Sequence, residues 1–196
     1  ERLRVERNKR KRPHRDDKVL TGWNGLAISA LASGYQISGN DSYLAAAQKC
    51  AVFIHERMWT GSELLRRYRD DESRFAGSLE DYAYLIEGLL HLYQSDFNPR
   101  WIDWARELQL SQDRLFLDEG RGAYFFAAPS ADVLFRRKDF VDSATPSPNS
   151  VSAQNLFKLF QFTGNSKLRE RCETILQLGA NEVERHPSAF SSLLVA

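Results

Sequence analysis

Three short polar clusters each stand directly before an amphipathic helical pattern, and they hold most of the side chains in this chain that could carry out chemistry. The first runs from Asp16 to Asn24, the second from Ser78 to Tyr82, and the third from Ser147 to Ser150. Carboxylates and amides can hydrogen-bond sugar hydroxyls, while aromatic rings can stack on the faces of sugar rings. The clusters therefore predict a site for a sugar or related polyol, provided that the fold brings them together.

Paired carboxylates could act as general acid and general base on a glycosidic bond. The catalytic candidates are Asp17, Asp81 and Asp142, with His14 as a proton shuttle. The candidates for substrate binding are Arg15, Asp16, Lys18, Trp23, Asn24, Glu80, Tyr82, Asn149 and Ser150. Among these, the two aromatic rings would stack on sugar, while the lysine and the two asparagines would bind hydroxyls. Hydrolysis and epimerisation both fit this set of groups.

Helix capping is the competing explanation for these residues. Ser78 and Ser147 suit N-cap positions, and the helix dipole alone favours an acidic residue in a first turn. Capping could therefore account for Glu80 and Asp81, and the aromatic residues of the clusters could instead belong to the core. The segment 16–18 offers three charged residues where a cap needs one. That excess favours a functional role for the first cluster.

Other classes of site have weaker support in the sequence. The four histidines are isolated, without H-E-x-x-H spacing or a neighbouring cysteine, so neither a metal site nor a cofactor is expected. Cys50 and Cys172 lie far apart and form no C-x-x-C motif, which favours reduced thiols in a cytoplasmic, intracellular protein. No apolar run is long enough for a membrane helix. A net charge of +1 provides no long-range field for nucleic acid or an acidic membrane.

Apolar residues with helical spacing predict helical hairpins over about 23–59, 79–116 and 148–184. The first and third hairpins also match in sequence at a shift of 125 residues. The matched residues are Asn24, Leu31, Gln36, Gly39 and Asn40 with Asn149, Leu156, Gln161, Gly164 and Asn165. Repeated hairpins joined by long loops predict an all-α fold, an α/α toroid. In such a fold the N-terminal ends of the inner helices gather on one face, which would bring the three clusters together.

The remaining segments are expected to be a lead-in, insertions and the start of another element. Residues 1–20 form a basic, polar lead-in, which fits a solvated approach to the first helix better than a nucleic-acid-binding tail. Residues 63–68 alternate weakly, and 122–128 with 133–138 resemble a two-stranded β-ribbon. Residues 188–196 are expected to begin a further helix. We expect the whole of 1–196 to be one partial toroid domain, an excerpt of a longer chain.

Residues 13–25, with the sequence PHRDDKVLTGWNG, resemble the first signature of the thioredoxin-domain-containing protein family typified by spermatogenesis-associated protein 20. Segments 79–83, 88–93 and 146–152 are similar to later signatures of that family, although its members more often have glycine where Pro148 stands. The resemblance implies part of the family's C-terminal α/α toroid, similar to six-hairpin glycosidases and N-acylglucosamine 2-epimerases. About three hairpins are present, and the family's thioredoxin-like domain is absent.

Two functional hypotheses follow from the sequence. In the first, the chain is a fragment of a carbohydrate-active toroid that binds a sugar or polyol at the inner-helix N-termini and catalyses glycoside hydrolysis or epimerisation. In the second, the toroid is a non-catalytic scaffold that supports the thioredoxin-like domain or binds a protein partner. The family has no firmly assigned reaction, so the resemblance narrows the fold more than the function.

Overall fold

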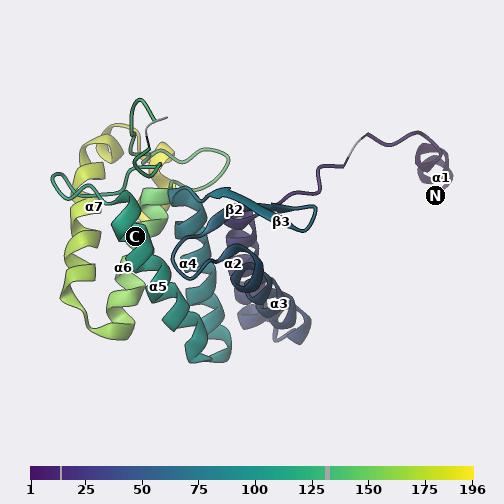
Figure 1. Ribbon diagram of the computed structural model, residues 1–196, viewed down its shortest axis with the longest axis horizontal. Coiled ribbons are helices and arrows are strands. Elements are labelled where there is room, and N and C mark those ends of the chain that lie inside the picture. Colours follow the sequence, from purple (N-terminus) through teal and green to yellow (C-terminus); the bar gives the residue numbers. More distant parts are fainter. Residues whose placement is uncertain (14, 131–132) are drawn as a thin grey trace.

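The computed structural model describes residues 1–13, 15–130 and 133–196, and three helical hairpins form its main body (Figure 1). This arrangement confirms the all-α hairpin fold expected from the apolar periodicity. Each hairpin pairs an inner helix with an outer helix. The helices are α2 (Thr21–Ser38) with α3 (Asp41–Met58), α4 (Leu79–Asp96) with α5 (Pro99–Phe116), and α6 (Pro148–Thr163) with α7 (Ser166–Arg185).

The turns of the first and third hairpins use the same local structure. Gly39 and Gly164 end the inner helices in the left-handed region, with φ of +67° and +69°. Asn40 and Asn165 then cap the outer helices, each accepting a hydrogen bond from a backbone N–H two residues further on, at 3.0 and 3.2 Å. Glycine adopts positive φ without steric cost, and asparagine is a preferred N-cap. The Gly-Asn pairs of the sequence repeat are therefore two copies of one turn.

The helices form two layers. Helix α4 packs against both α2 and α6, and each outer helix packs against the inner helix of its own hairpin. The core lies mainly between the layers, where Leu85, Ile86 and Leu89 of α4 are completely buried. The inner helices thus form a continuous wall, and the outer helices cover one side of it.

The contact between α2 and α4 is close enough to require glycine. A Cβ atom on Gly25 would lie 2.5 Å from the carbonyl carbon of Tyr84, and one on Gly88 would lie 2.6 Å from the carbonyl oxygen of Gly25. Both of these obstacles are backbone atoms, which cannot rotate away as a side chain can. The absence of side chains at these two positions is therefore what allows the first two inner helices to pack together.

A small antiparallel sheet joins the lead-in segment to the helices. Its strands β1 (Val19–Leu20), β2 (Leu65–Arg69) and β3 (Glu72–Ala76) pair in the order β1-β2-β3. Figure 1 shows the sheet beside the N-terminal ends of α2 and α4. Strand β2 includes most of the segment 63–68, whose alternation was weak in the sequence.

The ribbon expected over 122–138 is wrong for the residues described there. Neither 122–128 nor 133–138 forms a strand, and the segments are joined by a backbone hydrogen bond from Phe126 N–H to the Arg137 carbonyl at 2.8 Å. Cationic side chains stack on the aromatic rings instead, with Arg136 at 4.1 Å from the Phe125 ring centroid. Residues 131 and 132, at the expected turn, lie outside the described residues. In the described residues of 122–138, the alternating sequence therefore forms an irregular loop and not a strand pair.

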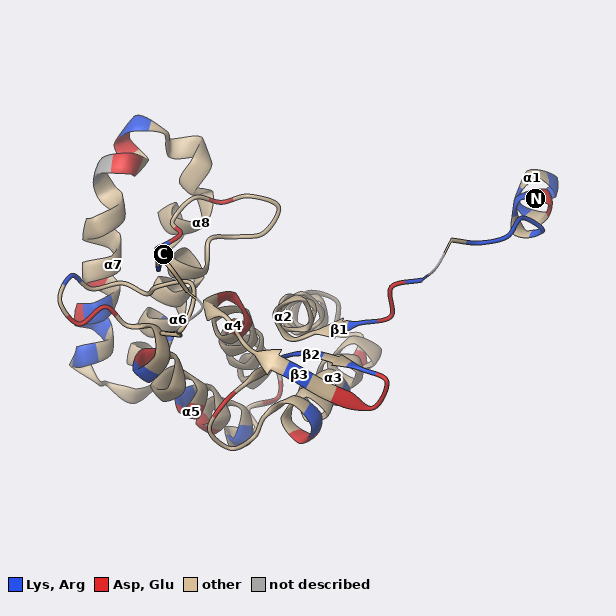
Figure 2. Cartoon of the chain, turned by 45° about the horizontal axis from the view of Figure 1, so that its top comes forward, with Lys and Arg blue, Asp and Glu red and all other residues tan. Residues whose placement is uncertain are grey.

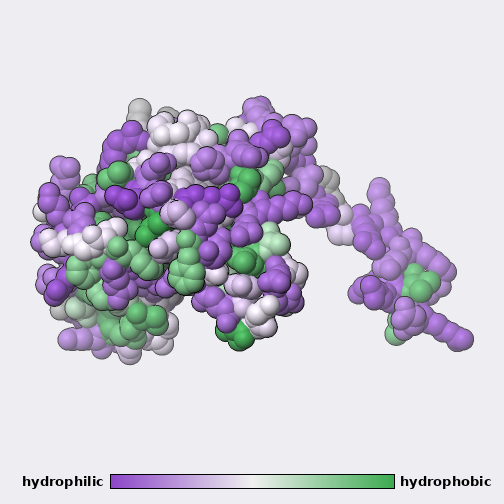
Figure 3. Space-filling model, turned by 90° about the horizontal axis from the view of Figure 1, so that it is seen from below, coloured by the Kyte–Doolittle hydropathy of each residue, from purple (hydrophilic) through white to green (hydrophobic). Residues whose placement is uncertain are grey.

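The two ends of the chain differ in how they contact the body. Helix α1 (Arg2–Asn8) has no buried residue, and Figures 1 and 2 show it apart from the hairpins. In the space-filling view this segment is mostly hydrophilic, whereas hydrophobic patches cover parts of the helical body (Figure 3). At the other end, the further helix expected over 188–196 begins as a 3₁₀ turn, η1 (Pro187–Phe190), and continues as the short α8 (Ser191–Leu194). Among the described residues, no helix is long and apolar enough to cross a membrane.

We predict that Gly25→Ala destabilises the protein by about 1–3 kcal/mol, because its methyl group would overpack the α2–α4 contact. Urea unfolding checks the prediction. Gly34→Ala is the matched control on the same helix, where the nearest obstacle is the Tyr43 ring at 3.3 Å. A side chain can adjust, so the control should stay within about 1 kcal/mol of wild type. Equal effects of the two substitutions would contradict the close packing inferred here.

Candidate functional site

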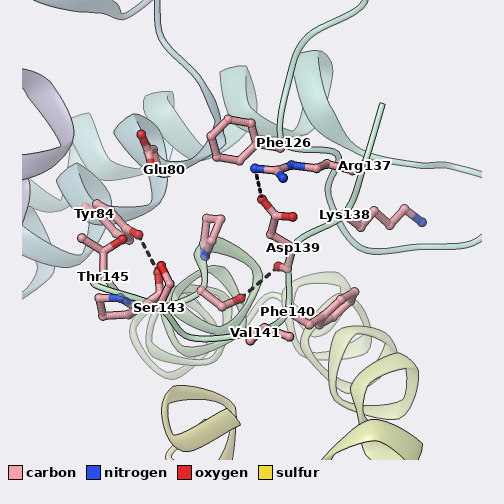
Figure 4. A pocket seen from close by; sticks show the side chains of 13 residues that line it. Glu80, Tyr84, Phe126, Arg137, Lys138, Asp139, Phe140, Val141, Ser143 and Thr145 are labelled. Atoms are coloured by element: carbon pink, nitrogen blue, oxygen red, sulfur yellow. Dashed lines mark hydrogen bonds and ion pairs between the residues drawn. The ribbon is translucent and has the colours of Figure 1, made fainter. Parts of the chain in front are cut away.

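A cavity of about 370 Å³ opens at the N-terminal ends of α4 and α6 (Figure 4). Glu80 and Tyr84 line it from α4, and the other walls come from Phe126 and from residues 137–148, which lead into α6. Figure 4 shows Glu80 and Tyr84 on one side, with Arg137 and Asp139 across the cavity. Carboxylate, guanidinium and phenol groups from two separate parts of the chain therefore face one space.

Both carboxylates of the cavity have a cationic partner. The Glu80 carboxylate accepts a hydrogen bond from Arg66 Nη2 at 2.8 Å. The Asp139 carboxylate forms an ion pair with Arg137 Nη2 at 3.2 Å. Each carboxylate side chain is partly exposed to the cavity, so its remaining lone pairs are available to a ligand.

Tyr84 supplies a neutral hydroxyl to the cavity wall. Its phenol donates a hydrogen bond to the Pro146 carbonyl at 2.5 Å, which joins α4 to the loop before α6. Burial raises the pKa of Tyr84 to about 12. The phenol therefore stays protonated near neutral pH, and only 1 % of the residue is exposed.

Arg66 of β2 organises the second polar cluster. Its Nη1 donates to Ser78 Oγ at 2.8 Å and to Asp81 Oδ2 at 2.9 Å, while Nη2 holds Glu80. Asp81 is only 2 % exposed and also accepts from the backbone N–H groups of Ser78 and Gly22, each at 2.9 Å. Burial raises the pKa of Asp81, and the charge of Arg66 opposes that rise. The contacts of Asp81 therefore fit the capping explanation, whereas its neighbour Glu80 faces the cavity.

Two further candidates from the sequence, Tyr82 and Asn24, lie within the packed structure. The Tyr82 hydroxyl accepts a hydrogen bond from Leu64 N–H at 2.8 Å, and its ring is buried. Asn24 donates to the Leu20 carbonyl at 2.8 Å and accepts from Cys50 Sγ at 3.3 Å. These contacts stabilise the ends of α2 and α4 and place neither side chain on the cavity wall.

The first polar cluster lies at the exposed N-terminal end of α2. Asp17 forms an ion pair with Arg69 of β2 at 2.9 Å, and Asp16 pairs with Lys18 at 3.2 Å. The hydrogen bond with Lys18 lowers the pKa of Asp16. Trp23 is 66 % exposed, which is unusual for a large aromatic side chain. The lining of the cavity described above includes none of these five residues.

Two further candidates, Arg15 and His14, precede that cluster in the chain. Arg15 is exposed. His14 lies outside the described residues, so its expected role as a proton shuttle stays a prediction.

The third cluster fixes the loop that forms the cavity wall. Asn149 is buried, donates to the carbonyls of Tyr124 and Asp139 at 2.9 and 3.0 Å, and accepts from Tyr124 N–H at 2.9 Å. Asp142 accepts from the backbone N–H groups of Ser147 and Ser192, both at 2.8 Å. The carboxylate of Asp142 thus joins the start of α6 to α8, and like Asn149 it does not line the cavity.

Ser150 has a different environment from its neighbours. It is completely buried, and its hydroxyl has no hydrogen-bond partner among the described residues. The backbone N–H of Ser150 donates to Ser147 Oγ at 3.3 Å, which confirms Ser147 as the N-cap of α6.

Of the residues proposed from sequence, the cavity contains Glu80. Three of its other polar groups were not anticipated, and neither was Arg66, which holds Glu80 from outside the cavity lining. Tyr84 could have been found, because it follows Glu80 by four residues and so shares its helix face. Arg66 carried only the weak strand signal of its segment. Arg137 and Asp139 lie in an irregular loop whose course no periodic pattern predicts.

A second group of polar side chains lies further along the inner helices, and we call it the His91 cluster. It consists of Ser29 and Ser33 on α2, Glu87 and His91 on α4, and Lys158 on α6. His91 Nδ1 lies 2.7 Å from Ser29 Oγ and 3.4 Å from Ser33 Oγ, while His91 Nε2 lies 2.6 Å from Lys158 Nζ. Burial, together with the charge of Lys158, lowers the pKa of His91 to about 4. No role was expected for this histidine from the sequence.

Neither the cavity nor the His91 cluster has the composition of a metal site. Throughout the described parts of the chain, no group of three or more histidine, cysteine, aspartate or glutamate side chains could hold a metal ion. Cys50 and Cys172 are free thiols. The groups that converge are those that form hydrogen bonds and transfer protons.

The chain is homologous to part of a known group of animal proteins. It is 35 % identical over 208 residues to human spermatogenesis-associated protein 20, and the alignment covers 100 % of this chain and 26 % of the relative. An uncharacterised protein of Caenorhabditis elegans is 30 % identical over 198 residues, and that alignment covers 97 % of this chain and 27 % of the relative. The chain spans about a quarter of the length of the curated relatives it matches. No protein-family model matches it.

Solved structures with the same fold include carbohydrate enzymes. A family 76 α-mannanase of Bacteroides thetaiotaomicron superposes with a TM-score of 0.69 at 16 % identity, covering 87 % of this chain and 47 % of the enzyme. Cellobiose 2-epimerase of Spirochaeta thermophila gives a TM-score of 0.68 at 15 % identity, with coverages of 83 % and 43 %. An inactive α-1,6-mannanase variant of Salegentibacter, in complex with α-1,6-mannotriose, gives a TM-score of 0.65 at 13 % sequence identity. That match covers 88 % of this chain and 49 % of the enzyme. The chain is therefore a partial α/α toroid.

We predict that Asp81→Ala destabilises the protein by about 1–3 kcal/mol, because it leaves two backbone N–H groups and Arg66 without their buried acceptor. Urea unfolding measures the loss. Asp41→Ala is the matched control, since Asp41 is an exposed acid in the first turn of α3. The control should lose about 0.3–1 kcal/mol, the contribution of the helix dipole. Equal losses would show that Asp81 contributes only through the dipole.

The His91 cluster predicts a loss of stability in acid. The unfolded chain has the ordinary histidine pKa of 6.5, whereas that of folded His91 is about 4. As pH falls through this window, the unfolded state binds a proton that the folded state does not, so stability falls. Burial also raises the pKa of Glu87, which acts in the opposite direction.

The test compares the free energy of unfolding at about pH 7 and about pH 5 in wild type and His91→Gln. Glu87 and Lys158 remain in both proteins, so the difference between the two pH dependences isolates His91 in its native surroundings. We expect His91→Gln to lose less stability than wild type on acidification. The same pH dependence in both proteins would refute the assignment.

Proposed function

We propose that this chain, a homologue of one segment of spermatogenesis-associated protein 20, contributes one side of a carbohydrate-binding site to the toroid of its parent protein. The observation that carries the proposal is the cavity at the N-terminal ends of α4 and α6, lined by Glu80, Tyr84, Arg137 and Asp139. Its volume of about 370 Å³ is within the range of small-molecule sites. The fold supports a sugar ligand, because the matching structures include a mannanase bound to mannotriose and a cellobiose epimerase.

Each polar group of the cavity has a chemical role in this proposal. Glu80, held by Arg66, accepts hydrogen bonds from sugar hydroxyls, and Asp139 does the same from the opposite wall. Arg137 donates to ring or hydroxyl oxygens. Because Glu80 and Tyr84 stand on a helix with a buried face, and Arg66 fixes the Glu80 carboxylate, these groups are held in place before a ligand arrives.

The first polar cluster would extend this site along the rim. Gly22 N–H donates to Asp81, so the N-terminal ends of α2 and α4 are directly joined. Trp23, exposed at that end, offers an aromatic face for a sugar ring. Asp17 and Lys18 would bind hydroxyls beside it.

For chemistry, we propose Glu80 and Asp139 as the carboxylates nearest to the ligand. In the present chain Glu80 and Asp81 are consecutive acids, and Asp81 is occupied by Gly22, Ser78 and Arg66. Glu80 is thus the better candidate acid or base, with Asp81 fixing its helix end. Hydrolysis would require Asp139 to face the same glycosidic bond, and epimerisation would require one base beside a sugar carbon.

A non-catalytic scaffold is the second candidate function. It is favoured by the contacts of Asp81 and Asp142, whose carboxylates both accept from two backbone N–H groups. In this alternative the polar clusters serve to fix loops and helix ends. It predicts that removing the Glu80 carboxylate changes no ligand affinity.

The proposal predicts that α-1,6-mannotriose, mannose or cellobiose raises the melting temperature of the full-length protein, and that Glu80→Gln weakens the binding by about tenfold or more. The substitution keeps the size of the side chain but removes the charge that accepts from hydroxyls. Glu119→Gln, at an exposed loop position, is the matched control and should bind as wild type. Absence of stabilisation by all three sugars, or equal affinity of Glu80→Gln and wild type, would favour the scaffold.

A further inference from the structure

We propose that the His91 cluster is a second binding site for sugar hydroxyls, at which an oligosaccharide extends from the cavity along the inner face of the helical wall. This inference rests on the proposed function of the cavity. It assigns a ligand role to Ser29, Glu87, His91 and Lys158, which join all three inner helices.

The cluster and the cavity share one face of α4. Glu80, Tyr84, Glu87 and His91 follow one another at intervals of four, three and four residues, which places them in a single stripe along the helix. The opposite side of α4 carries buried leucines such as Leu85 and packs against α5. Glu87 lies seven residues after Glu80 and hence about 10 Å further along the helix. A ligand with several sugar rings can therefore reach both.

The hydrogen bonds of the cluster leave donors unused. A lysine ammonium only donates, so Lys158 Nζ donates to His91 Nε2. The proton of the neutral imidazole must then be on Nδ1, which donates to Ser29 Oγ at 2.7 Å. Two of the three Lys158 N–H bonds and the hydroxyl proton of Ser29 have no acceptor among the described residues. These donors are available to hydroxyl oxygens of a ligand.

Glu87 supplies the complementary acceptor. Burial raises its pKa, and the charge of Lys158 lowers it again, so the two groups lie within electrostatic reach. They nevertheless form no ion pair, and the Glu87 carboxylate has no hydrogen bond from any residue that the structure describes. A partly buried charge without a hydrogen bond is costly. A ligand hydroxyl that accepts from Lys158 and donates to Glu87 would satisfy both groups, and neighbouring hydroxyls on a sugar ring provide such pairs.

An apolar layer lies between the two polar sites. Ala83, Tyr84 and Val151 form a small buried cluster, with the half-buried Leu26 packed against it. The layer therefore brings together the inner helices α2, α4 and α6. Ala83, Tyr84 and Val151 are at most 2 % exposed, so the layer holds the three helices together and leaves contact with a ligand to the polar groups on either side of it.

The test measures binding of α-1,6-mannotriose and of mannose to the full-length protein by calorimetry. Glu87→Gln and Lys158→Met should each lower the affinity for the trisaccharide by about tenfold or more, because each removes a charged hydrogen-bond partner. Mannose, which can occupy the cavity alone, should bind these variants nearly as tightly as wild type. Glu119→Gln and Lys49→Met, both at exposed positions, are the matched controls. If Lys158→Met fails to fold, Lys158→Gln replaces it.

A second readout follows the imidazole itself. The C–H resonance of His91, assigned by its absence in His91→Asn, should shift on addition of mannotriose, since the ligand shares Lys158 with the ring. Unchanged mannotriose affinity in the Glu87 and Lys158 variants, together with loss of binding in Glu80→Gln, would overturn this inference and leave the cavity standing. The reverse pattern would retain the cluster and reject the cavity. Absence of both sugar binding and a His91 shift would reject both.

Discussion

The approach of α2 to α4 is the constraint on which the rest of the structure depends. Gly25 and Gly88 allow the two backbones to meet, and Gly22 then comes close enough for its N–H to bind the Asp81 carboxylate at 2.9 Å. This contact sets the relative height of the two helix ends. Because Asp81 also binds Arg66, the same contact fixes the strand that holds Glu80. The close packing of α2 and α4 at Gly25 and Gly88 thus determines the position of Glu80 on the cavity wall.

The wall of inner helices has one side covered by outer helices and another side that carries polar groups. On that second side, the cavity at the helix ends and the His91 cluster further down are separated by the apolar layer around Val151. Polar groups on adjacent helices are costly to bury without partners, and here Glu87 and Lys158 lie within electrostatic reach of each other without forming an ion pair. The fold therefore combines a tightly packed interior with a polar face whose hydrogen bonds are incomplete.

The sequence predicted local structure well and long-range contacts poorly. Repeated Gly-Asn pairs identified the turns at Gly39 and Gly164, because left-handed glycine and an asparagine cap are local properties of the chain. The sequence could not distinguish the roles of Glu80 and Asp81, since either acid suits the first turn of a helix. Contacts with Gly22 of α2 and Arg66 of β2 decide that Asp81 is the buried one. The ribbon over 122–138 was wrong, because alternation alone does not reveal that Arg136 stacks on Phe125 and donates to the backbone carbonyls of Ala127 and Leu115.

Strand β2 gives the segment before Val19 a mechanical connection to the cavity. That segment is tied to β2 by the β1 pairing and by the ion pair of Asp17 with Arg69, and β2 reaches Glu80 through Arg66. The position of the lead-in chain and the orientation of a carboxylate on the cavity wall are therefore coupled through one short strand.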